Sequence, residues 1–464
     1  MDSHLEMPSA YRDPSGFVFR MNGQYYRQVN QSYAADYEHL FSSGLYQELT
    51  RKKWLIPHEE ITDAPGTKDR YKTILPEQIP VISYPYEWSP QQLQDAGLLT
   101  LSITRAAIEK GMILKDATPF NIQFLHGKPI FIDTLSLELY DPAKPWIAYR
   151  QFCESFLFPL YLQHYQKGDV DKLAMAYPEG IPAALTARLL PSKSRWKAGV
   201  WMHVLLQSKI QKDYQGSNKP PGSRSPAFSK TRLSRILEHL ENILKTLTTG
   251  IPQSKGWSNY YDETILSAAY LDKKEKLFCD MLESLTPASA LDLGANNGHF
   301  SRLLAAKNIR TIAVDADWRC IGDMYQQHRK NPVGHLLPLC IDLCYPTPDM
   351  GWLNKERPGF IRRAHSELVI ALALVHHLAL QRNIPLSGIA DLLAALTGQW
   401  LIIEFVPLSD IKAQTLVENK NRYHPDYGIT HFETCFSRYF NIEKKELIGD
   451  SGRILYRMKK LSNP

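Results

Sequence analysis

The stretch that decides the fold is Ala290-Leu-Asp-Leu-Gly-Ala-Asn-Asn-Gly-His-Phe-Ser-Arg-Leu-Leu304. Its first residues predict a buried strand, Gly294 and Gly298 predict a tight turn, and the residues after Gly298 predict a helix. A strand that passes through a glycine-bearing turn into a helix is how an open α/β sheet holds a nucleotide-like ligand. Because Gly294 has no Cβ, the backbone there can approach a ligand closely. The stretch therefore predicts a cofactor site.

An acidic residue is expected at the end of the next strand, where it can hold ribose hydroxyls. Thr311-Ile-Ala-Val-Asp315 is such a strand. The turn itself is preceded by Asp292, and a carboxylate there suits a pyrophosphate poorly. It suits a cofactor that carries an ammonium and a sulfonium. Asn296 lies within the turn, and asparagine accepts a positive φ better than other non-glycine residues.

This arrangement resembles motif I of class I S-adenosylmethionine-dependent methyltransferases, with asparagine where many members have glycine. The resemblance implies a Rossmann-like fold and S-adenosyl-L-methionine as the cofactor. It also implies a role for each matching residue. The methionine-side turn would be formed by Asp292, Gly294, Asn296 and Gly298, the ribose would be held by Asp315, and adenine would be bordered by Asp342 and Leu343.

The downstream pattern continues in the order that this family shows. A third apolar run, Leu336–Leu343, contains the acidic Asp342. Glu367–Leu378 predicts a continuous strand that resembles motif IV, whose carboxyl end faces the transferable methyl group. Trp400–Pro407 predicts a fifth strand, and two later segments, 441–447 and 453–458, predict a closing antiparallel hairpin. Together these matches predict a methyltransferase domain with leading helices over residues 230–464.

Two histidines, His376 and His377, stand where a general base would be placed. An unperturbed histidine has a pKa near ~6.5, close to the operating pH. Adjacent side chains of an extended strand point opposite ways, so one histidine is expected in the site and the other behind the sheet. Glu404 is a second catalytic candidate. Further site-lining candidates are Tyr260, Tyr261 and Tyr423.

The acceptor is left open by the sequence. The Asn-Pro-Pro-Tyr-like signature of enzymes that methylate exocyclic base nitrogens is absent, because this segment reads Ala-Leu-Val-His-His-Leu over 373–378. This argues against adenine or cytosine amino groups. The remaining acceptors are a small-molecule or sugar hydroxyl, or a protein side chain.

The N-terminal half carries a second pattern. The residues 17–29 alternate around Asn22-Gly23 and predict a β-hairpin. A helix over about 33–49, a strand over 80–84 and a long helix over about 90–110 are expected next. Asp116, Asn121 and Asp133 then follow with the spacing of the catalytic segment of protein-kinase-like and aminoglycoside-phosphotransferase-like folds. In those folds the first Asp orients the nucleophile, while the Asn and the second Asp hold magnesium.

Several parts of the phosphotransferase pattern are missing. No Gly-x-Gly-x-x-Gly loop is present, and no Val-Ala-Ile-Lys strand, although Arg27 lies near the expected lysine position. The Asp-Phe-Gly triplet reads Asp133-Thr-Leu. These departures favour a degenerate module that binds substrate or scaffolds. Only if this half is active would Asn121 and Asp133 hold a metal, with Asp116 as the base; no other metal site is expected.

Composition sets broad limits. A chain of 464 residues with 44% hydrophobic and 22% charged residues is typical of two globular domains. The net charge of +6 is a mild bias at this length, so nucleic acid is not the expected partner. The longest apolar run, 368–375, is far shorter than the ~20 residues that span a bilayer. No signal peptide is recognised, and six scattered cysteines indicate neither a disulfide framework nor zinc. We expect a cytoplasmic protein without a membrane partner, whose oligomeric state stays open.

The expected organisation is a kinase-like α+β domain over 1–210, a basic linker rich in Pro, Gly and Ser over 211–229, and the methyltransferase domain over 230–464. The two halves together resemble a bacterial group of two-part methyltransferases, some of them labelled nodulation-associated. Methyl transfer from S-adenosylmethionine is the leading hypothesis. The alternatives are an ATP- and magnesium-dependent phosphotransferase that uses the N-terminal half, and a non-enzymatic binding protein.

Overall fold

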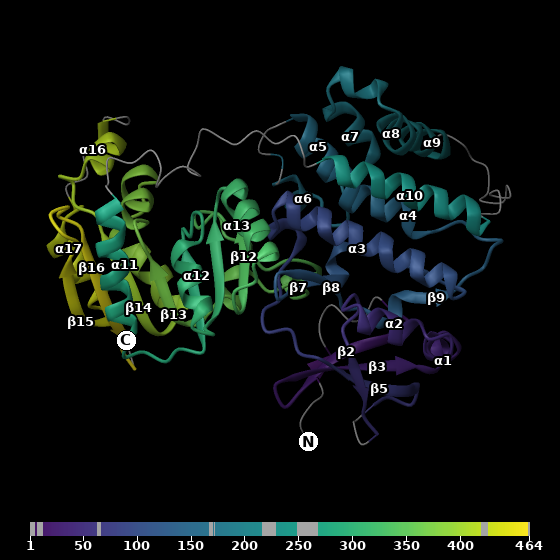
Figure 1. Cartoon of the computed structure of the whole chain (residues 1–464), viewed down its shortest axis with the longest axis horizontal. Helices are drawn as coiled ribbons and strands as arrows, with labels where there is room; N and C mark the ends of the chain where they lie inside the picture. The colour runs from purple at the N-terminus through teal and green to yellow at the C-terminus, as the bar shows by residue number, and fades with distance from the viewer. Residues whose placement is uncertain are drawn as a thin grey trace. The chain divides into compact units, whose positions relative to one another are not determined.

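The computed structural model describes residues 5–6, 13–62, 66–166, 170, 172–215, 229–247, 268–418 and 426–462. The chain divides into two compact units (Figure 1). Unit 1 comprises Met1–Gln253 and Met350–Arg357, and unit 2 comprises Ser254–Asp349 and Pro358–Pro464. Within the described ranges, no helix is both long enough and apolar enough to cross a membrane.

Unit 2 is built on a seven-stranded sheet whose order is β12-β11-β10-β13-β14-β16-β15. The first five of these strands are parallel, and β16 runs antiparallel to both of its neighbours. The strands are β10 (Ser289–Leu293), β11 (Arg310–Asp315), β12 (Leu336–Cys340), β13 (Ser366–Ala371), β14 (Thr397–Phe405), β15 (Phe440–Leu447) and β16 (Ile454–Lys460). The strand order reverses at β10, which is where open α/β sheets bind their ligands. The predicted Rossmann-like fold of this part of the chain is confirmed.

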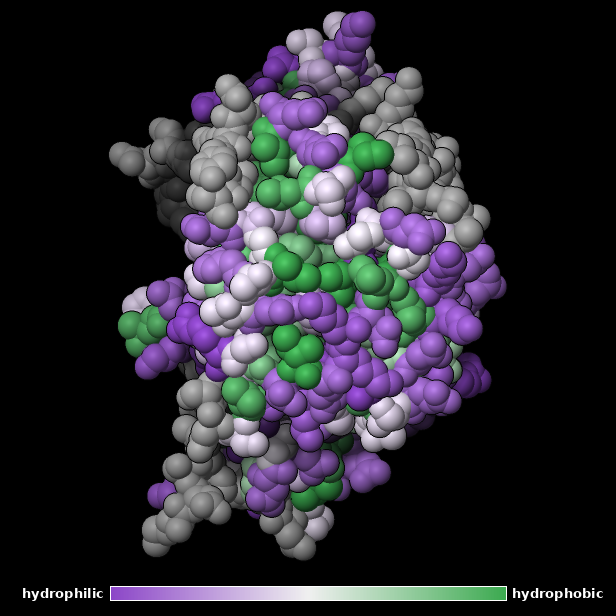
Figure 2. Space-filling model, turned by 90° about the vertical axis from the view of Figure 1, so that its left-hand side faces the viewer, coloured by the Kyte–Doolittle hydropathy of each residue, from purple (hydrophilic) through white to green (hydrophobic). Residues whose placement is uncertain are grey.

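Helices pack against this sheet and complete its core. They are α11 (Ala268–Leu282), α12 (His299–Ala306), α13 (Trp318–Lys330), α14 (Phe360–Arg363), α15 (Leu386–Leu396), α16 (Ile411–Glu418) and α17 (Ile429–Phe436). The core joins Phe278 and Met281 of α11 and Phe300 of α12 to the strand residues Leu368 and Ile402. Burying each such side chain contributes roughly 1.5–3 kcal/mol. The face of the molecule shown in Figure 2 presents apolar residues in several groups between hydrophilic ones.

Strand β13 is shorter than the continuous strand predicted over 367–378. It ends at Ala371, and Ala373 has a φ of 51° that interrupts the extended backbone. A π-helical turn, η11 (His377–Gln381), follows, and His376 has helical dihedral angles of φ −65° and ψ −31°. The two histidines therefore lie on a turn beyond the sheet and not on a strand.

Unit 1 begins with a five-stranded antiparallel sheet of order β1-β2-β3-β5-β4. Its strands are β1 (Leu5–Glu6), β2 (Gly16–Met21), β3 (Gln24–Asn30), β4 (His58–Glu60) and β5 (Arg70–Pro76). The predicted hairpin is confirmed: Asn22 and Gly23 connect β2 and β3 with φ angles of 50° and 81°, as a tight two-residue turn requires. The helix predicted over 33–49 is divided into α1 (Ala34–Ser42) and α2 (Leu45–Arg51), because Gly44 adopts a φ of 75°.

The strand predicted over 80–84 is wrong. Ser83 N donates to Gln123 Oε1 at 2.9 Å and Ser83 O accepts from Gln123 Nε2 at 3.0 Å. A buried side-chain amide thus takes the backbone groups that a neighbouring strand would otherwise bind. The long helix after it is confirmed as α3 (Pro90–Glu109), which is capped by Ser89 and has Pro90 at its first position.

Two small antiparallel pairs follow α3. Strand β6 (Met112–Leu114) pairs with β9 (Leu137–Leu139), and β7 (Ile122–Leu125) pairs with β8 (Lys128–Phe131). His126 and Gly127 form the turn that joins β7 to β8, with φ angles of 50° and 73°. Beyond them unit 1 is helical. The helical elements are α4 (Ala148–Phe152), the π-helical η6 (Cys153–Leu157), α5 (Phe158–Gln166), α6 (Leu173–Ala176), α7 (Ala183–Leu189), the 3-10 turn η7 (Ser192–Trp196), α8 (Ala198–Val200), the π-helical η8 (Trp201–Leu205), α9 (Leu206–Gln215) and α10 (Lys230–Leu247).

Helix α10 belongs to unit 1, whereas the expected boundary at residue 230 assigns it to the second domain. Its apolar face is buried, and the contact with α3 includes an ion pair between Arg105 and Glu241. Gly97 of α3 makes room for Leu244, because a Cβ at residue 97 would lie 3.1 Å from Leu244 Cδ1. Of the linker expected over 211–229, residues 211–215 continue α9, and 216–228 lie outside the described residues.

Candidate functional site

The turn between β10 and α12 has the conformation that its sequence predicts. Gly294, Asn296 and Gly298 adopt φ angles of 72°, 49° and 76°, in the left-handed region that favours glycine and tolerates asparagine. Gly298 N donates to Ala295 O at 2.8 Å, which closes the turn directly before α12. The turn lies at the carboxyl end of β10, between β11 and β13 in the sheet.

Asp315 is attached to this turn. Its Oδ2 accepts a hydrogen bond from Asn296 N at 2.9 Å, and its Oδ1 accepts one from Asp317 N at 2.9 Å. Burial raises the pKa of Asp315 above its usual range, and these backbone donors oppose the rise. A carboxylate offers about four lone-pair sites, so Asp315 can still accept from a hydroxyl group. The structure thus brings the predicted turn and the predicted acid together.

Asp292 lies behind the turn. Its side chain is buried, and Oδ2 accepts a hydrogen bond from Ser301 Oγ at 2.5 Å. The contact ties the first turns of α12 to β10. Burial raises the pKa of Asp292 to about 7, and the Ser301 hydroxyl opposes this rise. The carboxyl group therefore changes its protonation state near neutral pH.

Asp342 and Leu343 follow β12, the strand next to β11. Asp342 Oδ1 accepts from Cys344 N at 2.9 Å, and Arg382 Nη2 lies 3.7 Å from Asp342 Oδ2. Leu343 is partly buried beside it. The carboxyl ends of β10, β11 and β12 thus supply the turn and both acids to the same edge of the sheet.

The histidine pair differs from its prediction. The rings of His376 and His377 lie 4.1 Å apart, since a turn and not a strand carries them. The expectation that they point to opposite sides of the sheet is therefore wrong. His377 Nδ1 lies 3.3 Å from Gln381 Oε1. His376 is fully buried, and among the described residues neither of its ring nitrogens has a hydrogen-bond partner.

Both histidines are held neutral. Burial lowers the pKa of His376 well below its ordinary value, and the nearby charges of Arg453, Lys412 and Lys274 lower it further. Burial lowers the pKa of His377 to about 4. A buried polar group without a partner is rare in folded proteins and requires an explanation. A neutral imidazole in this position can accept a proton from a bound acceptor group or bind it through a hydrogen bond.

Glu404 is part of a buried ion-pair network and not a free base. It lies at the end of β14 with no exposed surface; Lys274 Nζ is 2.6 Å from its Oε2 and Arg453 Nη1 is 3.2 Å from its Oε1. Tyr270 OH donates to Glu404 Oε1 at 2.9 Å. Burial raises the pKa of Glu404, but the two cations outweigh it and hold the pKa below its usual range. Its surroundings give Glu404 a structural role.

Sequence reasoning missed the cations of this network. Lys274 is on α11, and Arg453 precedes β16, where its Nε and Nη2 donate to the two oxygens of Asp410 at 2.8 and 3.1 Å. Lys412 at the start of α16 is half-buried, and burial lowers its pKa to about 8. The one signal in the sequence was a lysine within the apolar side of an amphipathic helix. Tyr260, Tyr261 and Tyr423 lie outside the described residues.

In unit 1 the structure gathers the three residues of the predicted phosphotransferase pattern. Asn121 Nδ2 donates to Asp116 Oδ2 at 3.2 Å and to Ser136 Oγ at 3.1 Å, and Ser136 Oγ donates to Asp133 Oδ2 at 2.8 Å. Arg27 forms an ion pair with Asp133. The positive charge next to Asp133 is therefore supplied by the side chain of Arg27, at the carboxylate where the phosphotransferase pattern would place magnesium.

Two further observations bear on this cluster. Asp133 Oδ1 accepts from Leu135 N at 3.0 Å and caps the 3-10 turn η5 (Thr134–Ser136), which is a structural role. Among the described residues, no group of three or more His, Cys, Asp or Glu side chains is arranged to hold a metal ion. Burial and the charge of Asp133 raise the pKa of Asp116.

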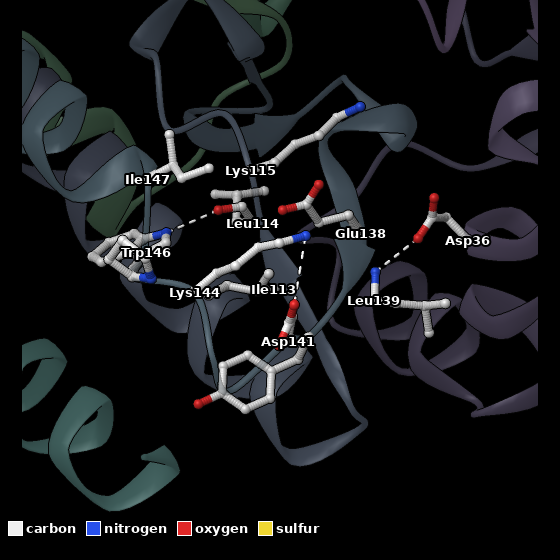
Figure 3. A pocket seen from close by; sticks show the side chains of 12 residues that line it. Asp36, Ile113, Leu114, Lys115, Glu138, Leu139, Asp141, Lys144, Trp146 and Ile147 are labelled. Carbon is white, nitrogen blue, oxygen red and sulfur yellow. Dashed lines mark hydrogen bonds and ion pairs between the residues drawn. The ribbon is translucent and has the colours of Figure 1, made fainter. Parts of the chain in front are cut away.

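A pocket of about 220 Å³ lies beside β6 and β9 and is lined by Glu138, Lys144 and Trp146 among others (Figure 3). Trp146 Nε1 donates to Leu114 O at 2.8 Å, and Lys144 Nζ lies 3.5 Å from Asp141 Oδ2. Its lining includes none of the predicted phosphotransferase residues. Its volume is below the roughly 300–1,000 Å³ of ordinary ligand pockets.

Comparisons with known proteins add the following similarities. No family model matches the chain. The chain is 29% identical over 463 residues to the nodulation protein NoeA of Rhizobium meliloti strain 1021, covering 97% of this chain and 95% of that protein.

Solved structures resemble part of the chain. The N-methyltransferase NodS from Bradyrhizobium japonicum WM9 is 13% identical with a TM-score of 0.31, covering 42% of this chain and 98% of that one. Magnesium protoporphyrin IX methyltransferase from Synechocystis PCC 6803 with bound SAM is 14% identical with a TM-score of 0.31, covering 42% of this chain and 80% of that one. The structures similar to this chain thus include methyltransferases.

Proposed function

We propose that unit 2 binds S-adenosylmethionine and transfers its methyl group to an acceptor that carries a hydroxyl or another proton-bearing nucleophile. One observation carries the proposal. The turn of Gly294, Asn296 and Gly298 lies at the strand-order reversal of the sheet, with Asp315 hydrogen-bonded to its backbone. This is the place and the chemistry for an adenosyl cofactor.

The residues present suit this cofactor. Gly294 and Gly298 allow the left-handed backbone of the turn, and a Cβ at these positions would lie 3.1 Å from Leu374 Cδ1 and 2.7 Å from Met324 Sδ. Asp315 offers remaining lone pairs to ribose hydroxyls, and Asp342 with Leu343 would border adenine. A bound S-adenosylmethionine supplies an electrophilic methyl group on a sulfonium. The protein then has to bind, align and desolvate the reactants, and alignment alone contributes much of the rate in such displacements.

His376 is the proposed proton acceptor or acceptor-binding group. Its imidazole is neutral, and within the described ranges neither ring nitrogen has a hydrogen-bond partner. His377, which lies against it and near Gln381, would hold the turn in place. Glu404 is not proposed as a base, because two cations and Tyr270 surround it. The acceptor is a small-molecule or sugar hydroxyl, or a protein side chain.

Calorimetric titration with S-adenosylhomocysteine tests the cofactor site. We expect micromolar binding, about −8 kcal/mol, that is lost in Gly294→Arg. Gly428→Arg in the same unit is the matched control, because a Cβ at Gly428 meets nothing within 4 Å. Absence of binding by the native chain, or equal binding by Gly294→Arg, would refute the proposal. Far-ultraviolet circular dichroism checks that the variants are folded.

The role of His376 needs a readout of transfer. Radiolabelled methyl groups from S-adenosylmethionine, incubated with the protein and a fractionated cell extract, would reveal the acceptor fraction. We expect His376→Asn to bind S-adenosylhomocysteine normally and to transfer about 10²–10⁴-fold more slowly, the usual contribution of a general base. A His376→Asn variant that transfers at the native rate would exclude His376 as the base.

A second candidate function is ATP-dependent phosphotransfer by unit 1. The gathering of Asp116, Asn121 and Asp133 favours it, whereas the Arg27 ion pair with Asp133 opposes magnesium binding there. Magnesium-dependent ATP turnover that is abolished by Asp133→Ala would support it. Without such turnover by the native chain, unit 1 is left with a binding or scaffolding role.

A further inference from the structure

One helical segment of unit 1 exposes an apolar face. Helices α8, η8 and α9 are continuous from Ala198 to Gln215. Of their exposed side chains, Trp201 is 57% exposed, and Met202, Leu206 and Ile210 are 38–45% exposed. Trp196, in the turn before them, is 91% exposed. Met202, Leu206 and Ile210 are spaced four residues apart and Trp201 precedes Met202 directly, so these side chains lie together on one face of the segment.

The opposite face of the segment is packed. Val200, His203 and Val204 are buried, and His203 Nε2 lies 3.0 Å from His239 Nδ1 on α10. A Cβ at Gly199 would lie 2.8 Å from Ile243 of the same helix. The core side of the segment is thus already occupied, so the exposed apolar side chains are not needed for packing against α10. A soluble surface rarely concentrates large apolar side chains without a partner.

The charged residues of this stretch of sequence have one sign. From Ile181 to Ile210 the sequence contains five basic residues and no Asp or Glu. The basic residues are Arg188, Lys193, Arg195, Lys197 and Lys209, and all five are exposed. Within the described residues, no carboxylate forms an ion pair with Lys193, Lys197 or Lys209. Apolar and tryptophan side chains interleaved with unpaired cations suit an interface between hydrocarbon and anionic headgroups.

We propose that the segment 192–210 docks unit 1 onto an anionic lipid surface. Trp196 and Trp201 insert their rings at the level of the headgroups, while Lys193, Arg195 and Lys197 contact the lipid phosphates. The attachment is peripheral. This inference goes beyond the proposed methyl transfer and does not depend on it. It concerns attachment to a lipid surface and involves no membrane-spanning helix. Nucleic acid is the less favoured occupant, because phosphate binding alone does not require the apolar face.

Vesicle co-sedimentation of the full chain tests this proposal. The probes are vesicles of phosphatidylcholine alone and of phosphatidylcholine with phosphatidylglycerol. We expect binding to the anionic vesicles only, weakened by salt. Lys193→Glu/Arg195→Glu/Lys197→Glu should reduce the partition coefficient more than about tenfold. Trp196→Ala/Trp201→Ala should reduce it severalfold at every salt concentration.

Matched controls distinguish vesicle binding by this surface from nonspecific binding by other exposed residues. Lys307→Glu/Arg310→Glu/Lys330→Glu makes the same charge change at three exposed residues of unit 2, and Trp352→Ala removes a tryptophan that is 67% exposed outside the segment. Both controls should bind vesicles like the native chain. All substituted side chains are exposed, and circular dichroism melting verifies that the variants fold.

Three results would overturn the proposal. The first is that the segment variants bind anionic vesicles as well as the controls do. The second is that the native chain binds an RNA or DNA oligonucleotide through Lys193, Arg195 and Lys197 but does not bind the vesicles. The third is that sedimentation velocity shows a dimer which Trp196→Ala/Trp201→Ala dissociates, since a second copy of the chain would then cover the face.

Discussion

Replacing Arg453 with methionine tests whether the buried ion-pair network holds unit 2 together. The side chain of Arg453 is 1% exposed and donates to four acceptors: two oxygens of Asp410 at 2.8 and 3.1 Å, Glu404 at 3.2 Å and Tyr270 at 3.3 Å. Methionine keeps much of the apolar length and removes all of these bonds. Glu404 would keep its ion pair with Lys274, whereas Asp410 would lose its ion pair with Arg453.

The expected cost follows from this burial. Removing one partner of a buried ion pair typically destabilises a protein by about 3–5 kcal/mol, because a charge is left uncompensated. This corresponds to a rise of about two to three and a half orders of magnitude in the equilibrium constant for opening. The control, Lys445→Met, breaks a pair with Glu433 in which the side chains are 44% and 31% exposed. An exposed pair of this kind contributes roughly 0.2–1 kcal/mol.

Hydrogen exchange followed by mass spectrometry is the assay, because it reports opening of β14 and β16 separately from unit 1. Arg453→Met should lower protection in both strands by about a hundredfold or more, and Lys445→Met by less than about tenfold. Adding Asp410→Asn to Arg453→Met should restore part of the loss, since one uncompensated carboxylate is removed. Equal effects of Arg453→Met and Lys445→Met would refute the reasoning.

The same network has a pH dependence with a definite sign. The folded-state pKa of Glu404 is lowered, so its contribution to stability is present above its unfolded-state pKa of about 4.3 and is lost as the pH falls through the folded-state value. The stability difference between the native chain and Arg453→Met should therefore be largest at neutral pH. It should shrink as the pH falls below about 4.

Three other predictions concern different parts of the chain. Asp292 has a folded-state pKa of about 7, above its unfolded-state value. Its contribution to stability is therefore complete below about pH 4 and is lost as the pH rises through 7, a change of at most about 4 kcal/mol in the free energy of unfolding. Asp292→Asn should abolish this pH dependence, as measured by denaturant titrations at several pH values. Gly298→Ala should weaken S-adenosylhomocysteine binding in calorimetry, because residue 298 has a φ of 76° and a Cβ there would lie 2.7 Å from Met324 Sδ; unchanged affinity would remove the turn from the cofactor site. Arg27→Met should lower hydrogen-exchange protection of β3 and β8 by about 1–2 kcal/mol, and Asp133→Asn should restore part of it if the ion pair between them is the cause.

Backbone conformations that depend on the residue type itself were predictable from the sequence. The φ angles of Gly294, Asn296 and Gly298, and those of Asn22 and Gly23, follow from the rarity of left-handed backbone in other residues. The parallel strands were predictable because strands buried on both faces form continuous apolar runs. The position of Asp315 beside the turn was predictable because Asp315 ends β11, and parallel neighbouring strands end at the same edge of the sheet.

Features that depend on contacts distant in sequence were not predictable. The strand expected over 80–84 failed because Gln123, forty residues away, takes the backbone groups of Ser83. Glu404 was interpreted as a catalytic candidate because its ion-pair partners, Lys274 and Arg453, are distant from it in sequence. They contact Glu404 from α11 and from the loop before β16. The histidine pair was placed on a strand because an alanine gives no sign of a positive φ. Ala373 has such a φ, and it interrupts the extended backbone before the histidines.

The position of β16 has a consequence for how the protein is made. This strand follows every other strand of its sheet in chain order, yet it lies between β14 and β15. During synthesis β14 therefore has an unpaired edge until residues 454–460 have left the ribosome, and Arg453 arrives at the same late moment to complete the network around Glu404. The sheet of unit 2 cannot be completed until residue 460 has left the ribosome, and any nascent chain released before residue 453 presents an open strand edge to other chains. Its yield in cells should accordingly depend on chaperones that protect the nascent chain.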